Sequence, residues 1–283
     1  MKSIWVFLLI PVALVCFLII YPLSETIYLA FTNWNGISPP ELNGLRNIQS
    51  ALSDPVFYQS LMNNVVWVVV FMLITNGLGL FFAGALDTMG KRLSHFYRIV
   101  LYISVLLPNV VISYLFLAVY DPQIGILNAF FNFLGLRSLG STLWLANPHI
   151  AIFSVLASSI WQYAAFPMLI FLAAFTGIRP QVLEAAKIDG ASELQIFLRI
   201  KVRSIFPIIV TMLALTWIWN SSPFGPIFTM TQGGPANATQ VLVTYLYTLG
   251  FNGYEFGYAS TIALVLILIV VPVAVIFVRT FDK

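Results

Sequence analysis

The chain has 283 residues, of which 60% are apolar and only 8% are charged, and its formal net charge is +3. Ordinary soluble domains carry roughly 25% charged residues, so this composition excludes a typical soluble enzyme and predicts an all-α integral membrane protein. A net charge of +3 gives no reason to expect a nucleic-acid partner.

Six apolar runs are long enough to cross about 30 Å of hydrocarbon. They lie at Ile4–Ala30, Val65–Leu86, Ile99–Val119, Ile150–Phe175, Ser204–Trp219 and Tyr258–Val278. Lys2 followed by an apolar stretch also fits a cleaved signal peptide. The apolar character continues well beyond the usual length of such a peptide, which favours a retained helix. We therefore predict six transmembrane helices in one domain, residues 1–283, with a core at about 60–280.

The basic residues indicate which side of the membrane each connecting segment faces. With the N-terminus inside, 11 of the 13 Lys and Arg residues fall in inside segments, and only Arg46 and Arg137 fall outside. This positive-inside bias predicts that both termini are cytoplasmic. The three outside segments, Thr32–Asn64, Tyr120–Pro148 and Asn220–Gly257, are long and rich in Asn, Gly, Pro and Ser.

The outer end of the fifth run is polar and contains two prolines. Pro223 and Pro226 should end or bend the helix, because proline lacks a backbone N–H. Backbone groups freed within the membrane are tolerated where protein or a wet cavity satisfies them. Asn220, Ser221 and Ser222 therefore mark either a water-accessible cavity or an ordinary helix end at the interface.

A short polar segment separates the fourth and fifth runs on the basic side. Pro180 suits a first helical position and Gly190 a C-terminal left-handed residue. Ser192 followed by Gln195 fits a capping box that starts a second helix. The pattern predicts a helix–turn–helix elbow at the membrane surface, which implies a partner that docks on it.

Several apparent motifs for catalysis or metal binding are incomplete in this sequence. The stretch Gly84–Lys91 resembles a phosphate-binding loop, but its spacing is wrong by one residue and Arg92 replaces the required Ser or Thr. His95 and His149 fall on opposite sides of the membrane, and Cys16 has no second cysteine to pair with. We therefore expect a chain that binds no cofactor itself and is not an enzyme.

The elbow carries a family resemblance. The run from Glu184 to Pro207, EAAKIDGASELQIFLRIKVRSIFP, resembles the EAA loop of permease subunits of bacterial ATP-binding-cassette (ABC) importers, in the maltose and glycerol-phosphate branch. The matching residues are Glu184, Ala185, Ala186, Asp189, Gly190, Ala191, Phe197, Ile200 and Pro207. Gly44–Asn47, Thr231–Pro235 with Thr239, and Phe256–Ser260 also resemble segments of that family. Arg203 stands where the family usually has a second proline, and Gly225 where an acidic or amide residue is frequent.

The resemblance implies a type-I permease domain in the bacterial inner membrane that forms half of the pore for a sugar or oligosaccharide. The implied partners are two ATPase subunits that bind ATP and Mg, a second permease subunit of a different sequence, and an extracytoplasmic substrate-binding protein. The elbow would contact an ATPase through Glu184, Ala185, Ala186, Lys187, Asp189, Gly190 and Ala191.

The resemblance also places sugar contacts on the fourth and fifth spans. The candidates are Trp161, Gln162, Tyr163, Trp217, Asn220, Ser221 and Ser222, with Asn220 as first choice. Aromatic rings cover the apolar faces of a sugar and amides bond its hydroxyls, although Trp and Tyr also form interfacial belts. The alternatives are an importer of glycerol phosphate or another small polar solute, or a membrane channel or enzyme outside the ABC class.

Overall fold

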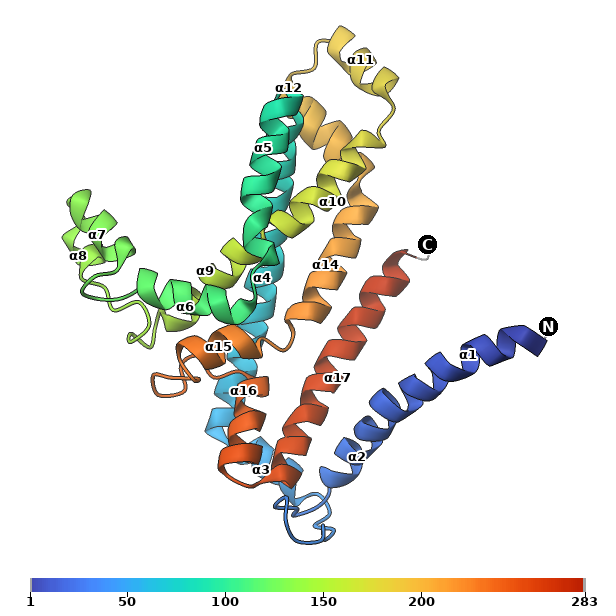
Figure 1. Cartoon of the computed structure of the whole chain (residues 1–283), viewed down its shortest axis with the longest axis vertical. Helices are drawn as coiled ribbons and strands as arrows, with labels where there is room; N and C mark the ends of the chain where they lie inside the picture. Colours follow the sequence, from blue (N-terminus) through green and yellow to red (C-terminus); the bar gives the residue numbers. More distant parts are fainter. Residues whose placement is uncertain (1, 282–283) are drawn as a thin grey trace.

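The computed structural model describes residues 2–281, and these residues form helices joined by loops, with no β-strand among them (Figure 1). Four helices in this range are long and apolar enough to cross a membrane, at Leu9–Leu29, Pro55–Asp87, Ala151–Thr176 and Phe256–Phe277. The first span consists of α1 (Lys2–Val15), the π-helical η1 (Cys16–Ile20) and α2 (Tyr21–Leu29), and the second is α4 (Pro55–Asp87). The third consists of α9 (Ala151–Tyr163) and α10 (Ala165–Thr176), and the fourth is α17 (Phe256–Phe281). The prediction of an all-α membrane protein is confirmed.

Two further helix pairs have sufficient length and hydropathy but are sharply bent. The first pair joins α5 (Lys91–Tyr102) and η2 (Ile103–Leu106) to α6 (Asn109–Val119) at 100°. The second joins α12 (Glu193–Gln195), η3 (Ile196–Lys201) and α13 (Val202–Ser204) to α14 (Phe206–Asn220) at 68°. The described residues therefore contain four candidate spans, or six if each bent pair counts as one.

The first bend divides the run Ile99–Val119, for which the sequence predicted one transmembrane helix. Leu107 adopts an extended conformation with ψ of 140°, and Pro108 begins the next helix as its N-cap. A residue that precedes proline is disfavoured in the α region, because the proline ring clashes with its backbone. The N–H of Val111 consequently donates to the carbonyl of Pro108, and α6 turns away from the bundle (Figure 1).

The remaining helices are short and lie at the ends of the bundle or beside it. They are α3 (Arg46–Ser53), α7 (Ile126–Phe133), α8 (Arg137–Gly140), α11 (Pro180–Ile188), α15 (Phe224–Met230), α16 (Leu242–Tyr247) and η4 (Thr248–Asn252). The elbow helices α11 and α12 and the start of α5 lie at one end of the molecule, and α3 lies at the other (Figure 1). The two ends correspond to the predicted inside and outside segments.

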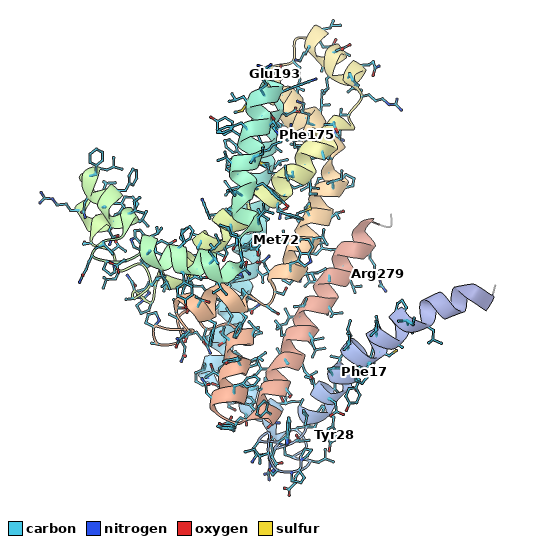
Figure 2. All side chains as sticks on the ribbon, in the orientation of Figure 1. Phe17, Tyr28, Met72, Phe175, Glu193 and Arg279 are labelled. Atoms are coloured by element: carbon cyan, nitrogen blue, oxygen red, sulfur yellow. The ribbon has the colours of Figure 1, made fainter. Side chains whose placement is uncertain are left out.

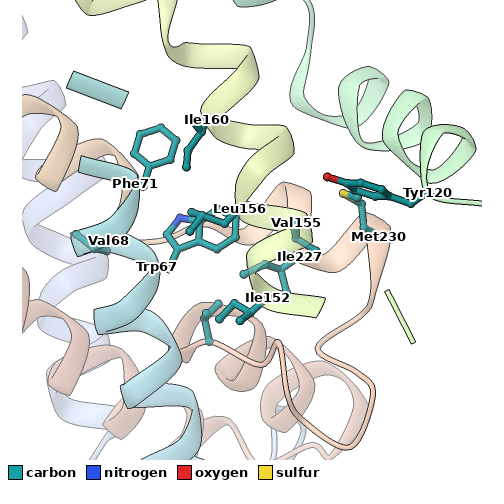
Figure 3. Close-up of a cluster of buried hydrophobic side chains, with 11 residues drawn as sticks. Trp67, Val68, Phe71, Tyr120, Ile152, Val155, Leu156, Ile160, Ile227 and Met230 are labelled. Carbon is teal, nitrogen blue, oxygen red and sulfur yellow. The ribbon is translucent and has the colours of Figure 1, made fainter. Parts of the chain in front are cut away.

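The helix α4 forms the centre of the packed bundle. Its buried Trp67 and Phe71 face Leu156 and Ile160 of α9 (Figure 3). Further along, Gly79 lets α10 approach closely, because a Cβ atom there would lie 2.6 Å from the Pro167 side chain. Such small residues allow close backbone contact between membrane helices.

The first helix contributes little to this core. The apolar window within Leu9–Leu29 is 0% buried in the chain, and α2 packs against α17. Side chains such as that of Phe17 accordingly extend into open space (Figure 2). This helix has an apolar surface that lipid or another membrane subunit must cover.

Candidate functional site

A cavity of about 460 Å³ lies against the inner face of α4. The other walls come from the bend between α5 and α6, from α9 and α10, and from the end of α14 with the turn into α15. Its lining residues are Trp67, Phe71, Thr75, Tyr102, Val105, Leu106, Asn109, Ser159, Tyr163, Phe166, Pro167, Thr216, Trp219, Asn220, Ser222, Pro223, Phe224, Gly225 and Pro226. Aromatic rings alternate with amides and hydroxyls, and none of these described lining residues carries a formal charge.

Three of the seven residues proposed from the sequence lie in this wall: Tyr163, Asn220 and Ser222. Tyr163 is held in place by a hydrogen bond of 2.6 Å from its hydroxyl to Oδ1 of Asn109. The break after Asn220, where Pro223 precedes α15, opens this side of the cavity. An aromatic ring beside amides and a hydroxyl can pack against a polyhydroxy solute and bond it at the same time.

Gln162 does not line the cavity; its hydrogen bonds stabilise the bend between η2 and α6. Its side chain is 1% exposed, and its Nε2 donates to the carbonyl of Leu107 at 2.8 Å. Its own carbonyl accepts a bond of 3.0 Å from the hydroxyl of Ser104. Gln162 therefore satisfies a backbone group that the bend removes from the helical ladder.

The other three candidates also lie away from the cavity wall. The hydroxyl of Ser221 donates to the carbonyl of Trp217 at 2.6 Å, and the Ser221 carbonyl accepts a bond from Asn64. Trp217 packs against the core around α4 and α9. Trp161 is half exposed and makes an edge contact with Phe116, 5.5 Å between ring centroids.

The cavity also contains polar residues that the sequence did not single out. Asn109 directly follows Pro108, and a proline followed by an amide inside an apolar run was a usable signal. Trp67 and Thr75 of α4 are fully buried, and Nε1 of Trp67 and Oγ1 of Thr75 have no hydrogen-bond partner in the described chain. Thr216 differs, because its hydroxyl accepts a bond of 2.9 Å from Nδ2 of Asn76.

The predicted start and end signals of the elbow helices are present in the structure. The helix α11 begins at Pro180 and is followed by Gly190 at φ +77°. Ser192 and Gln195 then form both bonds of a capping box. No residue of α11 is buried, and Ile188 is 87% exposed. An isolated helix of this length is marginal in water.

One exposed ion pair crosses the elbow turn. Nζ of Lys187 lies 2.9 Å from Oε1 of Glu193. The hydrogen bond to Glu193 and its negative charge raise the pKa of Lys187. Because both side chains are exposed, the pair contributes little to stability and is free to exchange partners.

Behind the turn, the elbow is fixed to the inner end of α4. Nζ of Lys201 forms an ion pair with Asp87, the last residue of α4. The ring of Phe197 packs against Gly84, where a Cβ atom would come within 2.5 Å, and against Phe175 at 6.1 Å between centroids. These contacts connect η3 with α4, the helix that also lines the cavity.

Comparison with known proteins identifies the family. Residues 75–282 match the family described as binding-protein-dependent transport system inner membrane component. The probable ABC transporter permease protein YurN of Bacillus subtilis is 33% identical over 276 residues, covering 96% of this chain and 94% of YurN. The multiple sugar-binding transport system permease protein MsmF of Streptococcus mutans is 27% identical over 99% of this chain and 95% of its own length.

The fold is also similar to that of a solved transporter. A chain in the crystal structure of a bacterial ABC transporter involved in import of the acidic polysaccharide alginate superposes with a TM-score of 0.84. The match covers 99% of this chain and 96% of the other at 20% sequence identity, a level that supports the fold. The matched family consists of membrane transport subunits, so the alternatives of a membrane enzyme or an unrelated channel are excluded. The chain is a multi-pass membrane protein that belongs to the family of binding-protein-dependent transport system inner membrane components.

Proposed function

We propose that this chain forms half of the pore of an ATP-driven importer for an uncharged sugar or oligosaccharide. The cavity beside α4 carries the proposal, because its wall combines aromatic rings, amides and hydroxyls without a formal charge. A polyhydroxy solute presents apolar ring faces and hydroxyl groups, which such a wall can contact together. The sugar-system name of MsmF supports this solute class.

In this proposal the chain crosses the membrane six times, with each bent pair counted as one span and both termini in the cytoplasm. The basic residues support this orientation, since 11 of 13 fall on the side of the elbow. Residues 1–283 form one permease domain with a core at about 60–280. The uncovered apolar surface of α1 and α2 supports a second permease subunit as a partner.

The elbow is the proposed contact with an ATPase subunit. Two such subunits would bind ATP and Mg, and each would receive the elbow of one permease through residues 184–187 and 189–191. The small side chains of Ala185 and Ala186 permit close approach, and Lys187 can exchange its exposed pair with Glu193 for a partner group. The ion pair between Lys201 and Asp87 then connects movement of the elbow with α4.

The sugar path in this proposal contains fewer of the residues that the sequence suggested. Tyr163, Asn220 and Ser222 remain as contacts and Asn109 joins them, since all four lie in the cavity wall. A substrate-binding protein would deliver the sugar from the outside. Gln162 and Ser221 act on the backbone around the cavity, as their hydrogen bonds indicate.

The solute class is tested with the importer assembled from this chain and the subunits produced with it, reconstituted in liposomes with the cognate binding protein. We expect ATP-dependent uptake of neutral oligosaccharides from a panel that also contains uronic-acid oligomers and glycerol phosphate. Uptake confined to the acidic or phosphorylated solutes would overturn the proposed solute class and favour the other importer branch.

The elbow role is tested with a matched pair of glycine substitutions. Gly190 and Gly44 have φ of +77° and +67°, and neither has an atom within 4 Å of an added Cβ. Gly190→Val and Gly44→Val therefore impose similar backbone strain, roughly 1–2 kcal/mol. We expect only Gly190→Val to lower uptake and to disconnect it from ATP hydrolysis. Equal behaviour of the two variants contradicts a docking role for the elbow.

A further inference from the structure

A small helical lobe projects sideways from the bundle at residues 121–148, and it contains α7 and α8. It begins where α6 ends, after the 100° bend. Figure 1 shows this outer lobe beside the bundle, at a level between the two ends of α4 and not beyond the end that carries α3. The sequence predicts that the segment 120–148 lies on the outside of the membrane, and the position of the lobe does not require that environment.

The outer lobe has its apolar side chains on the outside. On α7, Ile126, Phe130 and Phe133 form a stripe at positions i, i+4 and i+7, and all three are exposed, Phe133 to 87%. In α8 and the segments beside it, Leu136, Leu139 and Leu143 are also exposed. Soluble surfaces rarely gather large apolar residues in this way unless something covers them.

Two asparagine side chains of the outer lobe are hydrogen-bonded within it. Asn128 is buried, accepts a bond of 2.5 Å from Nε1 of Trp144, and donates to the carbonyl of Thr142. Asn132 donates to the carbonyl of Gly140 at 3.2 Å, and a Cβ on that glycine would meet the Asn132 side chain. These bonds satisfy amide groups inside the lobe, as a hydrocarbon environment requires.

Two hydroxyls of the outer lobe are also bonded within it, and its charged residues are few. The hydroxyls of Ser141 and Thr142 donate to carbonyls within the lobe. Only Asp121 and Arg137 are charged among its 28 residues. Asp121 lies at the junction with α6, where its carboxylate accepts two backbone N–H bonds, and an arginine can extend its charged end to the interface.

The apolar exterior is continuous with the exposed side of the preceding bent helices. Ile103 of η2 is exposed, as are Val110, Tyr114 and Leu115 of α6. Because the chain belongs to a family of membrane components, this row is a surface for lipid. The outer lobe extends that surface without an intervening band of charged residues.

We propose that the outer lobe is embedded in the outer leaflet of the bilayer and binds acyl chains through Ile126, Phe130 and Phe133. The rings of Phe131, Trp144 and Tyr120 fix it to the bundle, with centroids 5.8 Å apart for the first pair and 6.2 Å for the second. The lobe is thus a lateral anchor for the bend that forms one wall of the cavity.

The test measures the environment of the outer lobe directly and is independent of the transported solute. The importer assembled with its other subunits is placed in phosphatidylcholine nanodiscs, with Cys16→Ala removing the single native cysteine. A nitroxide is attached at Phe133→Cys and, in a second variant, at Ile126→Cys. Collision with oxygen, which concentrates in lipid, is compared with collision with a water-soluble nickel chelate.

Ile37→Cys is the matched control, because Ile37 is 85% exposed in the first outside segment and Phe133 is 87% exposed. We expect the ratio of oxygen to nickel accessibility to be at least about tenfold higher at Phe133 and Ile126 than at Ile37. A ratio equal to that of Ile37 places the lobe in water and overturns the proposal. Low accessibility to both reagents shows that a protein subunit covers the lobe, which overturns it equally.

Discussion

The substitution Gln162→Leu discriminates between two roles for a residue that the sequence placed among the sugar contacts. In the structure, Nε2 of Gln162 donates to the carbonyl of Leu107, a group that the bend before Pro108 has freed. Leucine is similar in size but has no donor. The variant therefore leaves a carbonyl without its partner inside the membrane domain, while the cavity wall keeps its shape.

The size of the effect follows from that single bond. An unsatisfied buried acceptor costs about 1–3 kcal/mol, which is roughly a 5- to 150-fold change in the equilibrium between folded and unfolded chain. At about 2–4 °C per kcal/mol for chains of this length class, the unfolding temperature of the assembled importer should fall by several degrees. Gln49→Leu, on the exposed side of α3, is the matched control and should leave the temperature unchanged.

Two measurements on the same preparation decide between the roles. Thermal unfolding followed by tryptophan fluorescence reports the loss of stability, and uptake kinetics report KM and the maximal rate. A bend-supporting role predicts lower stability in Gln162→Leu even without substrate. If the variant unfolds like the wild type and only its KM rises, Gln162 contacts the solute and the reasoning from its hydrogen bonds is wrong.

Two further predictions concern packing and charge. Gly79→Ala should destabilise the importer by about 1–3 kcal/mol through overpacking, because the new Cβ would meet the side chain of Pro167 at 2.6 Å. In the control Gly77→Ala, the added Cβ has no atom within 4 Å, so this variant should be neutral or slightly stabilising. Equal thermal stability of the two variants would contradict the proposed close approach of α4 and α10. Burial raises the pKa of Asp54, but hydrogen bonds from Tyr245, Tyr258 and two backbone N–H groups outweigh it and hold the pKa below its ordinary value of 3.8. This depressed pKa stabilises the folded chain above about pH 4 and the contribution is lost as the pH falls further, so Asp54→Asn should lower the unfolding temperature at pH 7 and approach the wild type in acid; a constant difference across pH refutes this.

Features with a local physical cause could be predicted from the sequence. The apolar runs have the length that hydrocarbon demands, and all six contain helix in the structure. Around the elbow, Gly190 adopts positive φ and Ser192 pairs with Gln195, as the spacing indicated. These outcomes depend on a few neighbouring residues and need no knowledge of tertiary contacts.

The side of a helix that faces a cavity could not be predicted in the same way. Trp161, Gln162 and Tyr163 are consecutive, and consecutive helical residues point about 100° apart. Only Tyr163 therefore reaches the cavity, while Gln162 turns to the bend and Trp161 to the outer surface. Choosing among them requires the direction of the neighbouring helices, which composition does not contain.

The bend at Pro108 shows how one position controls two distant features. Without it, Ile99–Val119 would continue as a straight span, Asn109 would be one more residue of that helix, and the segment after it would emerge in water. With it, Asn109 enters the cavity wall and bonds Tyr163, and α6 carries the outer lobe sideways along the bundle (Figure 1). Gln162 bonds the carbonyl of Leu107 at the bend, and the ring contact of Tyr120 with Trp144 lies at the far end of α6. In the proposed arrangement, movement of the lobe within the lipid would change the cavity wall, because both are attached to α6.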